Sequence, residues 1–123
     1  MNNGTQLVER YLAAWNETDP AARRTAIARL WSDRGRYVDP LADVEGHDQI
    51  SALIDGVQQQ VPGHVFELVG DEVDAHHNVA RFQWQLVPSA GGEPVAIGFD
   101  VAVTAEDGRI ESVLGFLDKA PAA

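Results

Sequence analysis

The spacing of apolar residues changes once along this chain, close to Val61-Pro62-Gly63. Before that point, apolar residues recur with the 3.6-residue period of helices. After it they alternate with the period of two that is typical of strands. This order predicts helices first and an antiparallel meander second, which is an α+β fold with helices packed on one face of a sheet.

Three helices are expected before the change of period. Apolar residues spaced four apart predict a helix over residues 5–16. Asp19-Pro20 has the form of an N-cap followed by proline at the first helical position, so a second helix begins there. The apolar spacing of residues 50–57 predicts a third helix that ends before Val61.

One short strand is expected at Arg36–Asp39, between a turn at residues 32–35 and Pro40. Four longer strands are expected after the helices. Turn-forming segments separate them, and His76-His77 belongs to one of these turns. The predicted strands cover residues 64–73, 78–87, 94–104 and 109–117.

Length and charge limit the possible classes of protein. The 123 residues suit a single domain over residues 1–123. The net charge of −10, from 19 acidic and 9 basic residues, argues against nucleic acid or an anionic membrane surface as a partner. The sequence has no cysteine, no apolar run long enough to span a membrane and no signal-peptide pattern, so we expect a cytoplasmic protein.

Motifs for metals and cofactors are missing from the sequence. It contains no HExxH motif, no Cys/His cluster and no glycine-rich phosphate loop. Adjacent residues on a strand point to opposite faces, so His76 and His77 are expected in a polar turn rather than on one ion. His47 is expected to cap or border the third helix. We therefore predict neither a metal site nor a cofactor.

The strand over residues 94–104 has two faces of different character. Its large side chains point one way, and its small residues and Asp100 point the other way. The small-residue face leaves room for a cavity. The large-residue face predicts a homodimer, because an exposed apolar surface of this size would be a liability. The large side chains are those of Val95, Ile97, Phe99, Val101 and Val103.

Three polar residues stand where the pattern predicts burial: Tyr11 in the first helix, Asp39 before Pro40, and Asp100 in the middle of a strand. A buried carboxyl group without a partner is costly, so burial shifts its pKa or recruits a hydrogen bond. Two carboxyls and a phenol in one cavity would make a proton-transfer site.

The order of elements, the segments ERYLAAWNETD and YVDP, and the strand around Asp100 resemble the nuclear transport factor 2-like superfamily, with its SnoaL-like and ketosteroid isomerase-like members. The resemblance covers nearly the whole chain. It implies a cone-shaped barrel, in which three N-terminal helices pack on a strongly curved, mainly antiparallel sheet and a pocket lies at the open end.

The resemblance to bacterial Δ5-3-ketosteroid isomerases implies catalytic roles for Tyr11, Asp39 and Asp100. Asp39 would take a proton from the carbon next to a carbonyl group, while Tyr11 and a protonated Asp100 would donate hydrogen bonds to the enolate oxygen. The substrate would be a small apolar molecule. Polyketide cyclases of the same superfamily resemble the chain too, and also use a pocket acid. The predicted pocket walls are Trp15, Phe82, Trp84 and Phe116.

Other interpretations of these residues stay open. Tyr11 would also suit a core position, and Asp39 would also suit a turn in which it accepts backbone N–H bonds. Arg34 and Arg36 lie close to Asp39 in sequence and would make it a weaker base. Arg81 is expected to point away from the cavity. A non-catalytic binding module for a small apolar ligand and a structural dimerisation domain are therefore the alternatives to an enzyme.

Overall fold

A computed structural model describes residues 3–71 and 73–120. Its helices are α1 (Asn3–Asn16), α2 (Pro20–Leu30) and α3 (His47–Gln60). Its strands are β1 (Trp31–Asp39), β2 (Ala42–Glu45), β3 (His64–Leu68), β4 (Asp74–His76), β5 (Val79–Pro88), β6 (Ala96–Thr104) and β7 (Ile110–Lys119). The α+β order predicted from the apolar spacing is confirmed.

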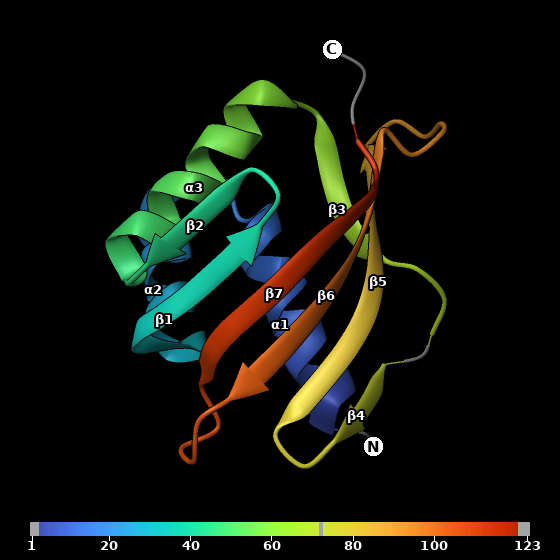
Figure 1. The fold of residues 1–123 in the computed structure, drawn as a ribbon. Coiled ribbons are helices and arrows are strands. Elements are labelled where there is room, and N and C mark those ends of the chain that lie inside the picture. The colour runs from blue at the N-terminus through green and yellow to red at the C-terminus, as the bar shows by residue number, and fades with distance from the viewer. Residues whose placement is uncertain (1–2, 72, 121–123) are drawn as a thin grey trace.

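The strands form one curved sheet in the order β2-β1-β7-β6-β5-β3. The short strand β4 stands outside this order and pairs with β5. The sheet does not close, because β2 and β3 are the two ends of this order. Neighbouring strands are antiparallel except for β1 and β7, which run parallel. Figure 1 shows the helices gathered on one side of the curved sheet, with α1 running along its concave face.

The N-terminus of α2 forms as its sequence predicts. The Asp19 carboxylate accepts a hydrogen bond from the backbone N–H of Ala22 at 2.9 Å, and Pro20 is the first helical residue. On α3, the ring nitrogen Nε2 of His47 lies 3.0 Å from the carbonyl oxygen of Trp31. His47 therefore ties the start of α3 to the start of β1.

Two predicted strand boundaries are wrong. The first strand begins at Trp31 rather than Arg36, and its pairing to β7 is shifted between these residues. The polar residues 32–35, expected as a turn, form this irregular stretch of strand. The predicted strand over residues 64–73 ends at Leu68, and the separate strand β4 follows after a loop.

The strand β2 was not predicted, because four residues of mixed polarity read as a loop. It pairs antiparallel with β1 through a turn after Asp39. The Arg36 guanidinium binds both carboxylate oxygens of Asp43 at 2.8 and 2.9 Å across this hairpin. Arg34 pairs with Glu45 at 3.2 Å. Both arginines therefore have carboxylate partners other than Asp39.

The core lies between the concave face of the sheet and the helices. Its largest fully buried side chains come from all three helices and from β1, β5 and β7. They include Ile27, Trp31, Ile50, Phe82 and Ile110. The turn between β4 and β5 contains His77, as predicted, but His76, expected in the same turn, is the last residue of β4. None of the helices in the described ranges is long and apolar enough to cross a bilayer.

Candidate functional site

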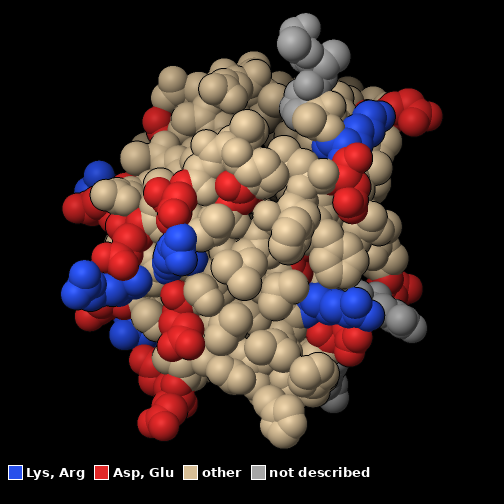
Figure 2. Space-filling model, viewed as in Figure 1, with Lys and Arg blue, Asp and Glu red and all other residues tan. Residues whose placement is uncertain are grey.

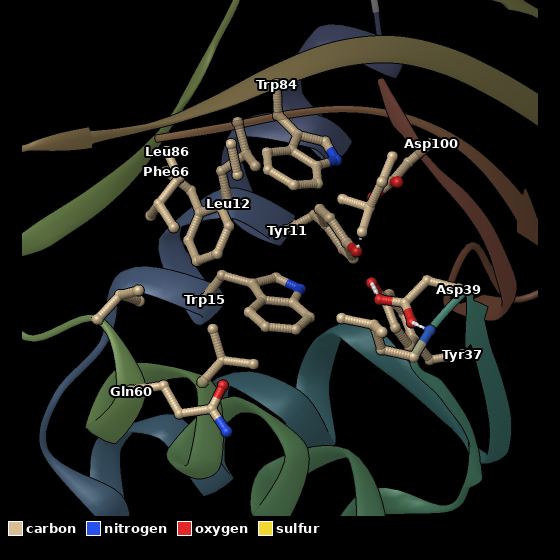
Figure 3. A pocket seen from close by; sticks show the side chains of 15 residues that line it. Tyr11, Leu12, Trp15, Tyr37, Asp39, Gln60, Phe66, Trp84, Leu86 and Asp100 are labelled. Carbon is tan, nitrogen blue, oxygen red and sulfur yellow. Dashed lines mark hydrogen bonds between the residues drawn. The ribbon is translucent and has the colours of Figure 1, made fainter. Parts of the chain in front are cut away.

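A cavity of about 120 Å³ opens between the helices and the concave face of the sheet. Four aromatic rings besides Tyr11 line it, from Trp15, Tyr37, Phe66 and Trp84. Apolar side chains such as Leu12, Leu86 and Leu117 complete most of the wall. Most polar groups gather at one end, where Tyr11, Tyr37, Asp39 and Asp100 point toward one another, and the Gln60 amide lies apart from them (Figure 3).

Asp100 is the most buried carboxylate at this end, with 2% of its surface exposed. It points inward from the middle of β6, where its cross-strand neighbours are Phe82 on β5 and Gly115 on β7. Its Oδ2 accepts a hydrogen bond of 3.1 Å from the Tyr11 hydroxyl. Its Oδ1 is buried and completes no hydrogen bond with any described residue.

The surroundings of Asp100 favour its protonated form. The pKa of its carboxyl rises from the usual 3.8 to about 6, mainly because of burial and to a smaller extent because of the charge of Asp39. The indole N–H of Trp84 and the hydroxyl of Tyr11 oppose this shift, because both stabilise the ionised form. A carboxyl with a pKa near neutrality can both take and return a proton under ordinary conditions.

Tyr11 reaches the cavity from α1 and is 2% exposed. Its ring packs edge-to-face on Phe82, with 5.6 Å between ring centroids. Burial is the main reason that its pKa lies well above 10, and the nearby Asp100 carboxylate adds to the shift. The phenol therefore keeps its proton and acts as a hydrogen-bond donor.

Asp39 ends β1 at the mouth of the cavity and accepts three hydrogen bonds. Its Oδ1 accepts the backbone N–H groups of Leu41 and Ala42, both at 2.8 Å. Its Oδ2 accepts the Tyr37 hydroxyl at 2.7 Å. Burial and the neighbouring carboxylates raise the pKa of Tyr37, so this phenol is also a donor. Asp39 thus holds the turn before β2 and also contributes to the cavity wall.

A glycine allows the two carboxyl groups to share one cavity. A Cβ atom on Gly115 of β7 would lie 2.8 Å from Asp100 Oδ1 and 3.3 Å from Asp39 Cβ. Any larger residue would push into one of these side chains. The missing side chain at this position is what leaves space between the end of β1 and the middle of β6.

The structure places some of the predicted site residues in the cavity and others outside it. Tyr11, Asp39 and Asp100 lie together in the cavity, and Trp15 and Trp84 line it. Phe82 supports Tyr11 from behind and does not line the cavity. The prediction for Phe116 is wrong, because its side chain is 59% exposed on the opposite face of the sheet.

The pairing of β6 with β7 explains the position of Phe116. Phe116 stands opposite Phe99, whereas Asp100 stands opposite Gly115. Cross-strand partners share a face, so Phe116 points away from the cavity and Leu117 points into it. Tyr37 was missed, although its spacing of two residues from Asp39 on one strand places both on the same face.

No three His, Cys, Asp or Glu residues in the described parts of the chain are placed so that they could hold a metal ion together. The polar groups that line the cavity are two carboxyls, two phenol hydroxyls and the Gln60 amide, beside a largely apolar wall. Such a set can move a proton and can stabilise a developing oxyanion.

The sequence profile of the SnoaL-like domain matches residues 8–113. The chain belongs to the SnoaL-like domain family. A candidate isomerase of this family from Agrobacterium tumefaciens is 42% identical, with a TM-score of 0.90 over 96% of this chain and 99% of that one. No curated protein is significantly similar in sequence.

More distant solved structures share the fold of this SnoaL-like chain. A candidate ketosteroid isomerase from Kribbella flavida has a TM-score of 0.70 at 18% identity, over 98% of this chain and 81% of that one. A candidate SnoaL-like polyketide cyclase from Jannaschia has a TM-score of 0.70 at 19% identity, over 93% and 86%. These likenesses establish the nuclear transport factor 2-like fold predicted from the sequence, and they leave the activity to be argued from the cavity.

Proposed function

We propose that this protein is a cofactor-free enzyme that transfers a proton next to the carbonyl group of a small apolar substrate. The observation that carries the proposal is Asp100, a carboxyl buried in an apolar cavity beside a phenol donor. Its pKa of about 6 suits a group that must accept and release a proton. The names of the fold relatives, candidate isomerase and candidate cyclase, agree with this class of reaction.

The proposed reaction is a proton shift in two steps. A carboxylate takes the proton from the α-carbon, and the electrons of the C–H bond form the enolate. Once Asp100 carries the proton, the Tyr11 hydroxyl can turn from it and donate its hydrogen bond to the enolate oxygen instead. Return of the proton to the same carbon gives hydrogen exchange, whereas its delivery to the far end of a conjugated system completes an isomerisation, in both cases without any redox partner.

We favour Asp100 over Asp39 as the group that takes the proton. Resemblance to the isomerases assigned this step to Asp39 and a neutral donor role to Asp100. With a pKa of about 6, however, Asp100 is about nine-tenths ionised at pH 7 in the empty cavity, so it is available as a base. Its Oδ1 lacks a partner, whereas both oxygens of Asp39 already accept hydrogen bonds.

The test is exchange of solvent deuterium into the α-position of small cyclic enones, followed by NMR. Asp100→Asn should slow exchange by about 10²–10⁴-fold, the usual loss when a general base is removed. Asp39→Asn should slow exchange by a smaller factor, because it only disturbs the turn after β1. The wild-type rate should rise with pH through about 6, because only ionised Asp100 can take a proton.

The control for this experiment is Asp118→Asn, which removes an exposed carboxyl from the end of β7. Equal exchange by wild type and Asp100→Asn would reject Asp100 as the base. A loss confined to Asp39→Asn would return the role to Asp39. Tight binding of enones with no exchange at all would favour the second candidate, a binding module for small apolar ligands, which the largely apolar wall also supports.

We also propose a homodimer through the outer face of the sheet. Phe116 and Leu114 of β7 are 59% and 42% exposed there. Their cross-strand partners on β6 are Phe99 and Val101, so the apolar residues are contiguous. Figure 2 shows this face as a broad uncharged area with most charged side chains at its margins. Such a patch on a monomer usually marks an interaction surface.

Light scattering at micromolar concentration should give twice the mass of the chain. Val101→Glu places a charge in the middle of the patch and should shift the protein to a monomer. Glu111→Gln on β7 is a control that removes a charge. A monomeric wild type, or a Val101→Glu variant that keeps the dimeric mass, would contradict the proposal.

A further inference from the structure

We infer that the ligand of this cavity is a compact, uncharged carbonyl compound of about one ring, and that Trp84 held against Gly98 sets this limit. The inference rests on the proposed function for the carbonyl group, and on the cavity itself for size and charge. The cavity measures about 120 Å³. An engineered protein cavity of about 150 Å³ binds benzene, so the space suits one six-membered ring and not a fused-ring system.

Three interlocked aromatic rings form one wall of the cavity. Phe66 of β3 packs edge-to-face against Trp15 of α1, with 5.2 Å between centroids. The same ring packs edge-to-face against Trp84 of β5 at 5.3 Å. The rings come from three different elements, so moving one requires the others to repack. This wall therefore resists expansion around a larger ligand (Figure 3).

The indole of Trp84 has no space to move away from the cavity toward the sheet. It stands opposite Gly98 on β6, and its indole lies flat across that residue. A Cβ atom at Gly98 would lie only 2.1 Å from Cζ2 of Trp84. The glycine thus lets the indole reach the backbone of the sheet, where it can move no farther outward. The far limit of the cavity is fixed by the sheet rather than by a flexible side chain.

The charge of the wall excludes anionic ligands. Asp39 and Asp100 line the cavity, and none of the described residues that line it is Lys, Arg or His. A ligand carboxylate would lose its hydration without gaining a counter-charge, and would be repelled by Asp100 and Asp39. Tyr11 and Tyr37 keep their protons, so either hydroxyl can turn from its carboxylate partner and donate to a neutral carbonyl oxygen of the ligand.

The test is a binding series followed by NMR chemical-shift titration. The neutral probes are 2-cyclohexenone, a two-ring enone and a four-ring steroid enone, and the anionic probe is cyclohexene-1-carboxylate. We expect 2-cyclohexenone to bind at least about tenfold more tightly than the two-ring enone, and the steroid not to bind, as expected for a rigid apolar pocket. The carboxylate should bind at least about tenfold more weakly than 2-cyclohexenone.

Variants of the wall sharpen the test. Trp84→Leu should open space beside Gly98 and improve binding of the two-ring enone by about tenfold relative to 2-cyclohexenone. Phe66→Leu should shift the same ratio in the same direction if Trp84→Leu fails to fold. Ala96→Leu should fill the cavity and abolish binding of every probe. Glu111→Gln, an exposed residue of β7 that does not line the cavity, is the control and should leave the ratio unchanged.

Size selectivity and catalysis can fail separately in these experiments. Tighter binding of the steroid or the two-ring enone than of 2-cyclohexenone by the wild type would overturn the inference, whatever the exchange rates. So would an unchanged ratio in both Trp84→Leu and Phe66→Leu. Selective binding of 2-cyclohexenone without deuterium exchange would uphold the inference on size and reject the proposed function.

Discussion

Replacing Asp100 by asparagine should stabilise this protein most at neutral pH and least in mild acid. The substitution keeps the size and the acceptor oxygen for the Tyr11 hydroxyl, and it removes the charge. In the wild type, the folded state raises the pKa of Asp100 from 3.8 to about 6. The folded state therefore binds more protons than the unfolded state between these values, and stability falls as pH rises through this range.

The size of the effect follows from the shift. About two pKa units correspond to about 3 kcal/mol of unfavourable free energy for ionised Asp100 above pH 6. Between pH 5.0 and 7.5, the same two pKa values give a change of about 1.4 kcal/mol. This pH range stays above the isoelectric point of about 4.6, where solubility is lowest. The packing cost of the new amide does not depend on pH, so it cancels from the change.

Urea unfolding followed by tryptophan fluorescence would measure the free energy of unfolding of both proteins across this range. The advantage of Asp100→Asn over wild type should grow by about 1.4 kcal/mol from pH 5.0 to 7.5. Glu93→Gln, an exposed residue in the loop before β6, controls for the loss of one negative charge. A difference between Asp100→Asn and wild type that is constant with pH would refute the reasoning about burial.

Two further substitutions test packing near and far from the cavity. Gly115→Ala places a methyl group 2.8 Å from Asp100 Oδ1, so it should lower the free energy of unfolding by about 1–3 kcal/mol and slow deuterium exchange into enones. Unchanged urea midpoints and exchange rates would contradict this. Arg23 is 3% exposed and its guanidinium binds Asp55, Gln58 and the carbonyl of Glu17. Arg23→Met should lower the free energy of unfolding in urea by about 1–3 kcal/mol and leave ligand selectivity unchanged. An unchanged free energy of unfolding would contradict this and would show that the methionine repacks fully.

Several features of the site were predictable because they follow from local patterns. The helical spacing of Tyr11 and Trp15 placed both on the buried face of α1. Asp100 interrupts an alternation of small residues in the middle of a strand, which marked it as inward-facing. In each case the signal was a polar group on a face that the period assigned to the interior, and such a signal does not depend on which strands pair.

The errors have a common cause, which is the pairing of strands. The parallel contact between β1 and β7 joins segments about 75 residues apart, and no local pattern specifies it. The face to which Phe116 points depends on its register with β6, where a shift of one residue reverses every side chain. Tyr37 was missed for a different reason, because an aromatic residue on a short strand suits a core position as well as a cavity wall.

Asp39 shows why resemblance alone leaves roles open. Its position before Pro40 agrees with both interpretations of the sequence, a base in the cavity and a residue that holds a turn. The structure gives it the contacts of both, since it lines the cavity and accepts the N–H groups of Leu41 and Ala42. The carboxyl of Asp39 differs from that of Asp100 in the hydrogen bonds that it accepts, and these depend on tertiary contacts.

The cavity and the proposed dimer surface arise from one arrangement of residues on β6 and β7. On the inner face, Gly98 and Gly115 remove the side chains that would otherwise fill the space around Trp84 and Asp100. On the outer face, large apolar residues alternate with these small ones, because successive side chains point to opposite sides. Strands that are small inside and large outside open a pocket on one face and expose an apolar surface on the other. A second subunit on that surface would also hold β6 and β7 rigid, and would thereby keep Asp100 in position.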